Sequence, residues 1–246
     1  MSEGQPDILL IHGAAHGAWC WHRVIPALAA LGHHARAIDL PSHGDDTTDP
    51  AEVTLDSYAQ AILNATRGPT LLVGHSMGGF PITAAAQLAP DRFTALIYLC
   101  AYLPLPGVTL AEMRRAGPRQ PLAGAFQIDA ARATFSFDPD QSPALFYHDC
   151  PADDVALARR RLCAQAIRPQ ETPIPDTSRA EALRRHYILC TDDRAIPPEY
   201  QATMAARLPP HHIHDLATSH SPFFAAPEAL AQKIHAIAQL PPVKRA

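Results

Sequence analysis

The sequence predicts an α/β fold, in which about six mostly parallel strands form a sheet with helices on both faces and an inserted lid. Short apolar segments recur along the chain, and helical patterns follow them. Segments without polar alternation are typical of strands buried on both faces, as in a parallel sheet. Repeated strand–helix alternation then places helices on either side of that sheet. The 246 residues are sufficient for one such domain with an insertion.

The expected elements follow one another in order along the chain. The strands are expected at residues 8–11, 35–40, 71–73, 93–99, 187–190 and 212–216. The helices are expected from Trp19 to a closing Gly32, from an N-cap at Thr54 to Gly68, from Ser76 to before Pro90, from Pro197 to about Leu208 and from Pro227 to about Ala238. Prolines at helix starts and glycine after a helix end support these limits.

The regular alternation stops between Leu103 and Ser178, where prolines are frequent. The clearest helix of this segment is expected from Asp154 to Ala166. Its aromatic side chains need burial: Phe126, Phe135, Phe137, Phe146 and Tyr147. Because a disordered linker would lack such residues, we expect a lid over the site. The predicted division is an α/β core of residues 1–103 and 184–246 and a lid of residues 104–183.

Composition and charge argue against several classes of protein. The net charge is −4, and the basic triplet at 159–161 has no interleaved aromatic residues, so we expect no nucleic-acid partner. No apolar run approaches the ~18 residues of a membrane-spanning helix, so we expect no membrane partner. The five cysteines are widely spaced and the first residues lack a basic leader region, which favours a cytoplasmic protein.

The residues around Ser76 predict the chemistry. An apolar strand leads into Gly74-His75-Ser76-Met77-Gly78, which fits the G-x-S-x-G pattern of a nucleophile elbow. In such a turn the serine hydroxyl stands above the end of the sheet, where a substrate carbonyl can reach it. The following helix directs its first N–H groups to the same place. We therefore predict that Ser76 is a nucleophile.

A serine nucleophile needs a base and a carboxylate that orients the base. Reactive groups of a parallel sheet gather beyond the carboxyl ends of its strands. His220 follows the last expected strand and is the predicted base. Asp192 and Asp193 both follow the preceding strand, and spacing alone leaves the choice between them open. The order serine, acid, histidine is the one expected for a nucleophile elbow in an α/β sheet.

Two backbone N–H groups are expected to form an oxyanion hole. One belongs to Met77, the residue after the nucleophile, and the other belongs to the loop after the first strand, where we choose Ala14. His16 and His75 either touch the substrate or pack in the core, and we favour packing for His75. We predict neither a metal nor a cofactor. The densest histidine cluster, at 211–214, would be divided between the two faces of a strand.

The motifs together resemble the α/β-hydrolase group that contains the plant methyl esterases and the hydroxynitrile lyases. The resemblance covers about residues 7–103 and 186–238 and rests on Ile11-His12-Gly13-Ala14-Ala15-His16-Gly17-Ala18-Trp19, Leu31-Gly32-His33, Ala37-Ile38-Asp39-Leu40, Gly74-His75-Ser76-Met77-Gly78-Gly79 and Cys190-Thr191-Asp192-Asp193-Arg194-Ala195-Ile196-Pro197. It implies Ser76 as nucleophile, Asp193 as orienting acid and His220 as base. It also implies that the Ala14 and Met77 N–H groups form the oxyanion hole.

Two departures from the lyase pattern favour an esterase. The lyases have threonine where this chain has Ala14, and lysine where this chain has Ser221. The lid also lacks the tryptophan that relatives often place over the substrate, so substrate contacts fall to other side chains. We expect those contacts from Ala15, His16, Phe126 and Tyr147.

The predicted function is that of a serine carboxylesterase acting on small to medium esters, with methyl and aryl esters as candidates. The alternatives are a hydroxynitrile lyase, lactonase or amidase on the same triad, and a non-catalytic relative that binds small ligands. The expected partner is a small-molecule ester. A homodimer is left open beside a monomer.

Overall fold

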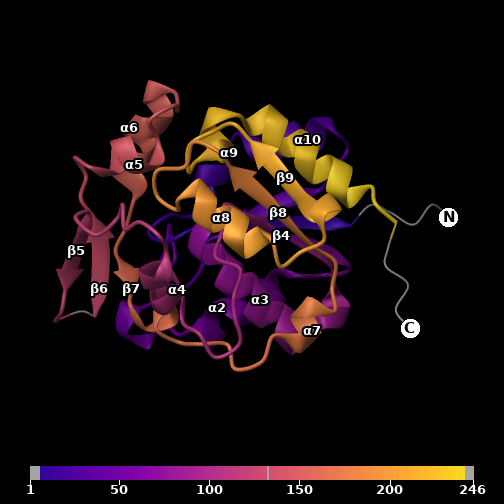
Figure 1. The fold of residues 1–246 in the computed structure, drawn as a ribbon, viewed down its shortest axis with the longest axis horizontal. Helices are drawn as coiled ribbons and strands as arrows, with labels where there is room; N and C mark the ends of the chain where they lie inside the picture. Colours follow the sequence, from indigo (N-terminus) through magenta and orange to yellow (C-terminus); the bar gives the residue numbers. More distant parts are fainter. Residues whose placement is uncertain (1–5, 132, 242–246) are drawn as a thin grey trace.

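The protein is described here from a computed structural model, which covers residues 6–131 and 133–241. Most of the N-terminal stretch used above to predict the compartment, residues 1–5, lies outside the described residues. Six parallel strands form the main sheet in the order β2-β1-β3-β4-β8-β9 (Figure 1). Their bounds are Asp7–Ile11 for β1, Ala35–Ile38 for β2, Thr70–His75 for β3, Phe93–Leu99 for β4, Arg185–Cys190 for β8 and Ile213–Leu216 for β9. The predicted fold class is therefore confirmed.

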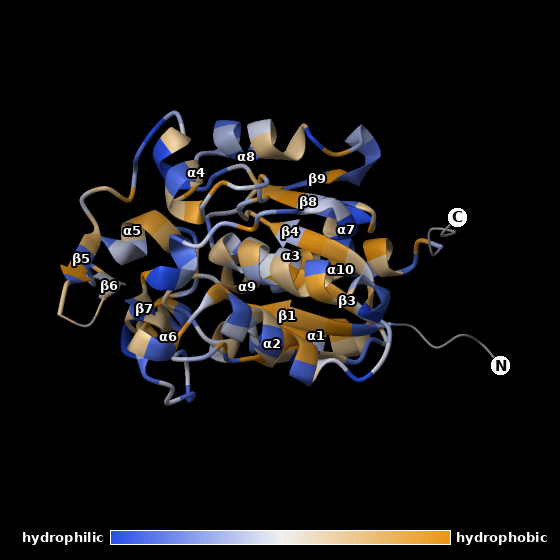
Figure 2. Ribbon diagram, turned by 90° about the horizontal axis from the view of Figure 1, so that it is seen from below, coloured by the Kyte–Doolittle hydropathy of each residue, from blue (hydrophilic) through white to orange (hydrophobic). Residues whose placement is uncertain are grey.

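Alternate residues of each strand face the two opposite layers of the molecule. In β1, Leu9 and Ile11 belong to one buried cluster, whereas Ile8 and Leu10 belong to the other. The apolar strands lie in the interior and the more polar helix faces lie outside (Figure 2). Burial on both faces explains why the strands lack polar alternation.

The two helical layers have separate members. The first layer contains α2 (Leu55–Ala65), α3 (Gly79–Leu88), α7 (Ser178–Glu181) and α8 (Pro198–Ala205). The second contains α1 (Val24–Ala30), α9 (Pro222–Ala225) and α10 (Pro227–Ala238). The expectation at Thr54 is confirmed, because its hydroxyl caps α2 in a capping box with Ser57.

The first predicted helix is wrong in one respect. Trp19 lies in a separate 3₁₀ turn, Ala18–Trp21, and α1 begins only at Val24. Trp19 and Trp21 therefore belong to this short turn and do not extend the apolar face of α1. The predicted end is confirmed: Gly32 has φ +83° and donates its N–H to Ala29, as expected of a glycine that closes a helix.

The segment between β4 and α7 contains a second, smaller sheet. It lies beside the main sheet, on the left of Figure 1. Its elements are α4 (Leu110–Ala116), β5 (Phe126–Asp129), β6 (Thr134–Phe137), α5 (Ser142–Phe146), α6 (Ala152–Arg161) and β7 (Gln165–Ala166). The three strands are antiparallel.

The predicted helix from Asp154 to Ala166 is corrected by this sheet. Helix α6 ends at Arg161, because Leu162 takes an extended conformation and the next residues turn back toward the core. Cys163 donates its N–H to the Ala15 carbonyl, and Gln165 and Ala166 then pair with β6.

Among the described residues, no helix is long and apolar enough to cross a membrane.

Candidate active site

Ser76 lies at a sharp turn between β3 and α3. Its φ is +53°, a left-handed conformation that costs energy in a residue with a side chain. The turn also requires glycine nearby, because a Cβ on Gly74 would lie 2.5 Å from the Gly78 carbonyl oxygen. The strand–turn–helix context predicted for the elbow is therefore present. Ser76 remains partly exposed and lines a cavity.

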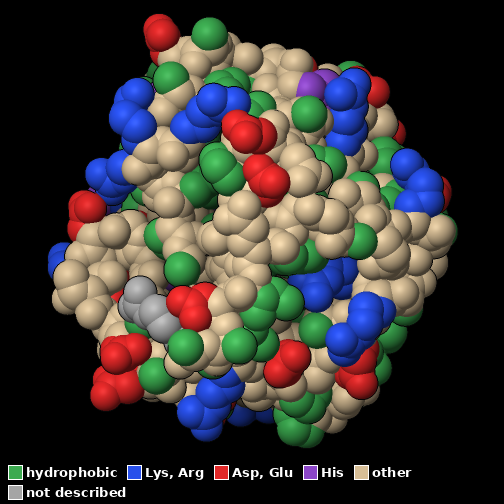
Figure 3. All heavy atoms as spheres, turned by 90° about the vertical axis from the view of Figure 1, so that its left-hand side faces the viewer, with side chains coloured by type: hydrophobic (Ala, Val, Ile, Leu, Met, Phe, Trp, Pro, Cys, Tyr) green, Lys and Arg blue, Asp and Glu red, His purple; other side chains and the backbone are tan. Residues whose placement is uncertain are grey.

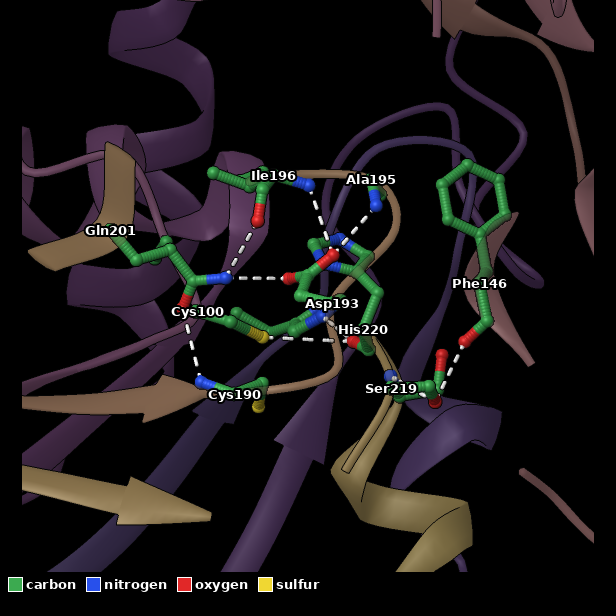
Figure 4. A network of polar contacts seen from close by, with 12 residues as sticks. Cys100, Phe146, Cys190, Asp193, Ala195, Ile196, Gln201, Ser219 and His220 are labelled. Atoms are coloured by element: carbon green, nitrogen blue, oxygen red, sulfur yellow. Dashed lines mark hydrogen bonds and ion pairs between the residues drawn. The ribbon is translucent and has the colours of Figure 1, made fainter. Parts of the chain in front are cut away.

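His220 and Asp193 meet beyond the carboxyl ends of β9 and β8. The His220 Nδ1 atom lies 2.7 Å from Asp193 Oδ2, and both side chains are buried (Figure 4). Asp192 is exposed. Of the two acids that spacing left open, only Asp193 contacts His220.

The Asp193 carboxylate is held by three further donors. Oδ1 accepts the backbone N–H groups of Ala195 at 2.7 Å and Ile196 at 2.9 Å. Oδ2 accepts the side-chain amide of Gln201 at 2.7 Å in addition to His220. Such a set of donors holds the carboxylate in a fixed orientation. The acid therefore presents one oxygen to the His220 ring and is restrained at the other.

The backbone of His220 is fixed by two side chains from neighbouring strands. His75 donates its Nε2–H to the His220 carbonyl at 2.8 Å, and the Cys100 thiol approaches the same oxygen at 3.6 Å. Burial lowers the pKa of His75 well below its usual value, so the ring is neutral. The packing role expected for His75 agrees with this contact, although the ring also lines the cavity.

The side chains of His75 and Cys100, together with the His220 ring, form the one group in the described chain whose ligand atoms are close enough to hold a metal ion. The ligand atoms of His75, Cys100 and His220 lie within 4.8 Å of one another. Two of the three already contact the His220 carbonyl, and His220 itself contacts Asp193. These contacts account for the cluster without a metal.

The turn before His220 is tied to the segment that precedes α6. Ser219 donates its N–H to Asp149 Oδ2 at 2.7 Å. Its hydroxyl donates to the Phe146 carbonyl at 3.1 Å (Figure 4). Phe146 also lies against the His220 ring, with 5.7 Å between ring centroids. The inserted segment thus contributes directly to the position of His220.

The backbone of Ala14 and Met77 reaches the same cavity as Ser76. Within the described chain, neither N–H has an assigned hydrogen-bond acceptor. The neighbouring glycine is required by close packing, because a Cβ on Gly13 would lie 2.7 Å from His75 Nδ1. Both N–H groups are thus unpaired within the described chain.

The cavity is narrow, because the centre of a water-sized sphere can reach only about 30 Å³ of it. Ser76 and His220 lie in its wall. Most of the remaining lining is aromatic or aliphatic: Tyr102, Leu110, Leu122, Phe126, Phe135, Phe137, Phe146 and Ile196. The polar exceptions outside the triad region include Gln170 and Arg114. The cavity therefore suits a largely apolar ligand.

Two of the four predicted substrate contacts line this cavity, and two do not. His16 and Phe126 are lining residues. Ala15 is buried, with its N–H bonded to the Gln165 side chain, and Tyr147 lies behind His16. In this structure Ala15, whose backbone is left-handed (φ +61°), and Tyr147 therefore lie outside the cavity lining.

His16 is locked in one neutral form. Burial lowers its pKa to about 4. Its Nδ1–H donates to the Ala14 carbonyl at 2.8 Å, and its Nε2 accepts the Tyr147 hydroxyl at 2.6 Å. The chain from Tyr147 through His16 therefore fixes the backbone beside the Ala14 N–H.

Sequence reasoning missed Gln201, Cys100 and Arg114. Gln201 and Cys100 contact Asp193 or His220 only because distant strands and helices meet there. Arg114 lies in a segment without a recognisable motif. A polar residue in the first turns of the helix after Asp193 was the single local signal available for Gln201.

Comparisons with known proteins agree with this geometry. A family model described as "Alpha/beta hydrolase family" matches residues 8–233. A pyrethroid hydrolase of Sphingobium wenxiniae is 33% identical over 96% of this chain and 88% of its own length. Methylesterase 1 of Arabidopsis thaliana is 28% identical over 91% of this chain and 92% of its own.

Solved structures give the same result. The crystal structure of a pyrethroid hydrolase from Sphingobium faniae JZ-2 matches with a TM-score of 0.87 and 31% identity, covering 96% of this chain and 98% of that one. The methylesterase MES16 from Arabidopsis matches with a TM-score of 0.83 and 25% identity over 96% of this chain and 100% of its own. The likeness spans both the main sheet and the inserted segment.

Proposed function

The chain belongs to the alpha/beta hydrolase family and is a carboxylic ester hydrolase, and we propose that it works through an acyl-enzyme on Ser76. The observation that carries the proposal is the contact between His220 and Asp193, whose two carboxylate oxygens each accept two hydrogen bonds. His220 lines the same cavity as Ser76. Its substrates are small to medium carboxylic esters. No step requires a metal or cofactor.

In the proposed first step, Ser76 Oγ attacks the ester carbonyl while His220 Nε2 takes the hydroxyl proton. Asp193 holds the other ring nitrogen protonated, so that Nε2 is free to accept. The C–O bond to the alcohol then breaks, and His220 returns its proton to the leaving alcohol. In the second step His220 removes a proton from water, which attacks the acyl-enzyme and releases the acid and Ser76.

The Ala14 and Met77 N–H groups are proposed to bind the oxyanion of both tetrahedral intermediates. Both lie in the wall of the cavity. Loss of one donor in such a hole lowers turnover by about 10²–10³-fold in other enzymes. The neutral His16 ring supports this wall, since a proton on both nitrogens would disrupt its bond from Tyr147.

We propose that residues 104–183 act as a lid on a core of residues 1–103 and 184–246. Residues of this segment, Phe126 and Phe146 among them, form much of the cavity wall. Methyl and aryl esters suit the aromatic lining. We further propose a cytoplasmic protein without nucleic-acid or membrane partners, in keeping with five unpaired cysteines, and a homodimer or monomer as its state.

The proposal is tested with a fluorophosphonate and a panel of p-nitrophenyl esters of increasing acyl length. We expect stoichiometric labelling at Ser76 and turnover of the short esters. Ser76→Ala should abolish labelling and reduce turnover to the uncatalysed background. Ser136→Ala, which removes a partly buried hydroxyl outside the cavity wall, should leave both unchanged.

Three outcomes would overturn the proposal. Full ester turnover by Ser76→Ala would exclude the acyl-enzyme. Release of cyanide from a cyanohydrin without ester hydrolysis would indicate a lyase, and ligand binding by a folded protein that never reacts with the fluorophosphonate would indicate a non-catalytic relative.

A further inference from the structure

We infer that this site takes esters that carry a second, anionic group, and that Arg114 binds that group. The substrate class is a monoester of a dicarboxylic acid, with the free carboxylate several bonds from the ester. This inference rests on the proposed ester hydrolysis and specifies its substrate. It starts from a basic side chain that lines the largely apolar cavity.

Arg114 projects from α4 into the wall that also contains Ser76 and His220. Its guanidinium carbon lies 4.4 Å from the centre of the Phe126 ring. In the described part of the chain, the guanidinium has no hydrogen-bond acceptor and forms no ion pair. Five N–H donors in a half-buried position are thus left to solvent or to a ligand.

The other arginines of the described chain that are buried or partly buried all have hydrogen-bond or ion-pair partners: Arg36, Arg161, Arg184 and Arg185. The Arg161 guanidinium, for example, pairs with Asp45 at 3.0 Å. Arg114 differs from these four, because within the described residues its guanidinium contacts the Phe126 ring but forms no hydrogen bond or ion pair.

Desolvation acts on Arg114 without removing its charge. Burial lowers the pKa of its guanidinium, and the ordinary value is so high that the group stays protonated at neutral pH. Two groups interact with it favourably, Glu171 and Tyr102. Glu171 is exposed and lies outside the Ser76 cavity, and burial raises the pKa of Tyr102, which keeps that hydroxyl neutral. Among the described residues no ion pair joins Arg114 to Glu171, so the guanidinium next to the cavity keeps its N–H donors for a ligand.

A second hollow continues from the cavity past Arg114. It shares Tyr102, Leu122, Phe126 and Arg114 with the Ser76 cavity. Arg115 and Arg119 also line it, and its lining contains no acidic side chain. Figure 3 shows the face of the molecule that carries the inserted segment, where hydrophobic, basic and acidic side chains are interspersed.

The arrangement fits a ligand with an ester at one end and an anion at the other. The ester carbonyl lies at Ser76, the hydrocarbon chain crosses the aromatic wall, and the carboxylate meets the Arg114 guanidinium. A planar guanidinium suits a carboxylate because two N–H groups can donate in parallel. The surrounding apolar side chains strengthen this contact by excluding water.

The experiment uses methyl esters in matched pairs. Each pair consists of the monomethyl ester of a straight-chain dicarboxylic acid and the methyl ester of the same acid with its free carboxylate replaced by a primary amide. The two substrates have the same leaving alcohol, shape and length and differ in charge. The measured quantity is the ratio of kcat/KM for the acid to kcat/KM for the amide, over a series of chain lengths and at low and high salt.

We expect a ratio above one that peaks at one chain length and decreases with added salt. Arg114→Gln should reduce the peak ratio by about 10-fold or more, and Arg114→Lys should retain part of it. The matched control is Arg160→Gln, which makes the same change in net charge on the exposed face of α6. That control should leave the ratio unchanged.

Two results would overturn the inference while leaving the proposed function intact. The first is a kcat/KM ratio near one at every chain length, in a protein that hydrolyses the methyl esters of the amide-bearing substrates. The second is an equal loss for both substrates in Arg114→Gln, which would assign Arg114 to packing against Phe126. Fluorophosphonate labelling of each variant separates these results from a failure of the proposed function, in which neither labelling nor hydrolysis would be detected.

Discussion

The replacement Asp193→Asn tests the candidate site most directly, because the contacts of Asp193 determine how the amide must sit. Both carboxylate oxygens accept two donors each. An amide provides one oxygen, and its NH₂ group must face one of these donor pairs. The two possible orientations have different consequences for His220.

If the amide NH₂ replaces Oδ1, it faces the N–H groups of Ala195 and Ile196, and both lose their acceptor. If it replaces Oδ2, it faces Gln201 and His220. His220 can then change tautomer, so that its Nδ1 accepts a hydrogen bond from the amide, and only Gln201 loses an acceptor. Gln201 cannot rotate to help, because its Oε1 accepts the Cys190 N–H and its Nε2 also donates to the Ile196 carbonyl.

The second orientation leaves one buried donor unpaired instead of two, so it is favoured by about 1–3 kcal/mol. In this state the proton of His220 lies on Nε2, and the ring cannot accept the Ser76 proton. The productive tautomer is therefore reduced about 5- to 150-fold. Loss of the carboxylate charge next to the imidazolium contributes about as much again. We expect kcat/KM to decrease by about 10²–10⁴-fold in total.

The assay is hydrolysis of p-nitrophenyl acetate together with the rate of fluorophosphonate labelling, and both should decrease in parallel. Urea unfolding should show a loss of about 1–3 kcal/mol, the cost of one unpaired donor. Asp192→Asn is the matched control, since that exposed side chain should tolerate the change. Less than a fivefold loss of kcat/KM in Asp193→Asn would refute the assignment of Asp193 as the orienting acid.

Two further predictions concern stability. His16→Phe should weaken the pH dependence of the free energy of unfolding. The folded pKa of His16, about 4, lies below the unfolded value, so His16 lowers the free energy of unfolding by about 3 kcal/mol as pH falls from 7 to 4. Urea unfolding at both pH values measures this, and an unchanged pH dependence in the variant would contradict it. Gln201→Leu leaves Asp193, Ile196 and Cys190 with one partner fewer each and should lower the free energy of unfolding by about 2–3 kcal/mol, whereas the exposed Gln60→Leu should change it by under ~0.5 kcal/mol. Equal effects of the two glutamine variants would contradict the second prediction.

Much of the core could be predicted because its signals are local. A strand buried on both faces is recognisable from a few consecutive apolar residues, and the expected strand 93–99 coincides with β4. The Ser76 turn carries its own glycines, which the close approach of Gly74 to Gly78 requires. Such features need no knowledge of distant contacts.

The remaining features depend on contacts between distant segments. Strand β5 forms because it pairs with β6, and β6 also pairs with β7 from far along the chain. None of these short segments shows a clear alternation of apolar and polar residues. Asp192 and Asp193 are adjacent residues of the same type, and it is the fold that buries Asp193 and leaves Asp192 exposed. Ala15 and Tyr147 lie outside the cavity lining for the same reason, since residues near a reactive group in sequence can support it from behind.

The bonds from Ser219 to Asp149 and Phe146 have a consequence for protein engineering. A segment that only covered a pocket could be exchanged between relatives to change specificity, with the core left as a constant scaffold. Here the inserted segment also fixes the residue before His220. A chimaera that receives a foreign insert must therefore also receive a carboxylate and a carbonyl at these two places, or its histidine will lose its alignment even when the new pocket fits the new substrate.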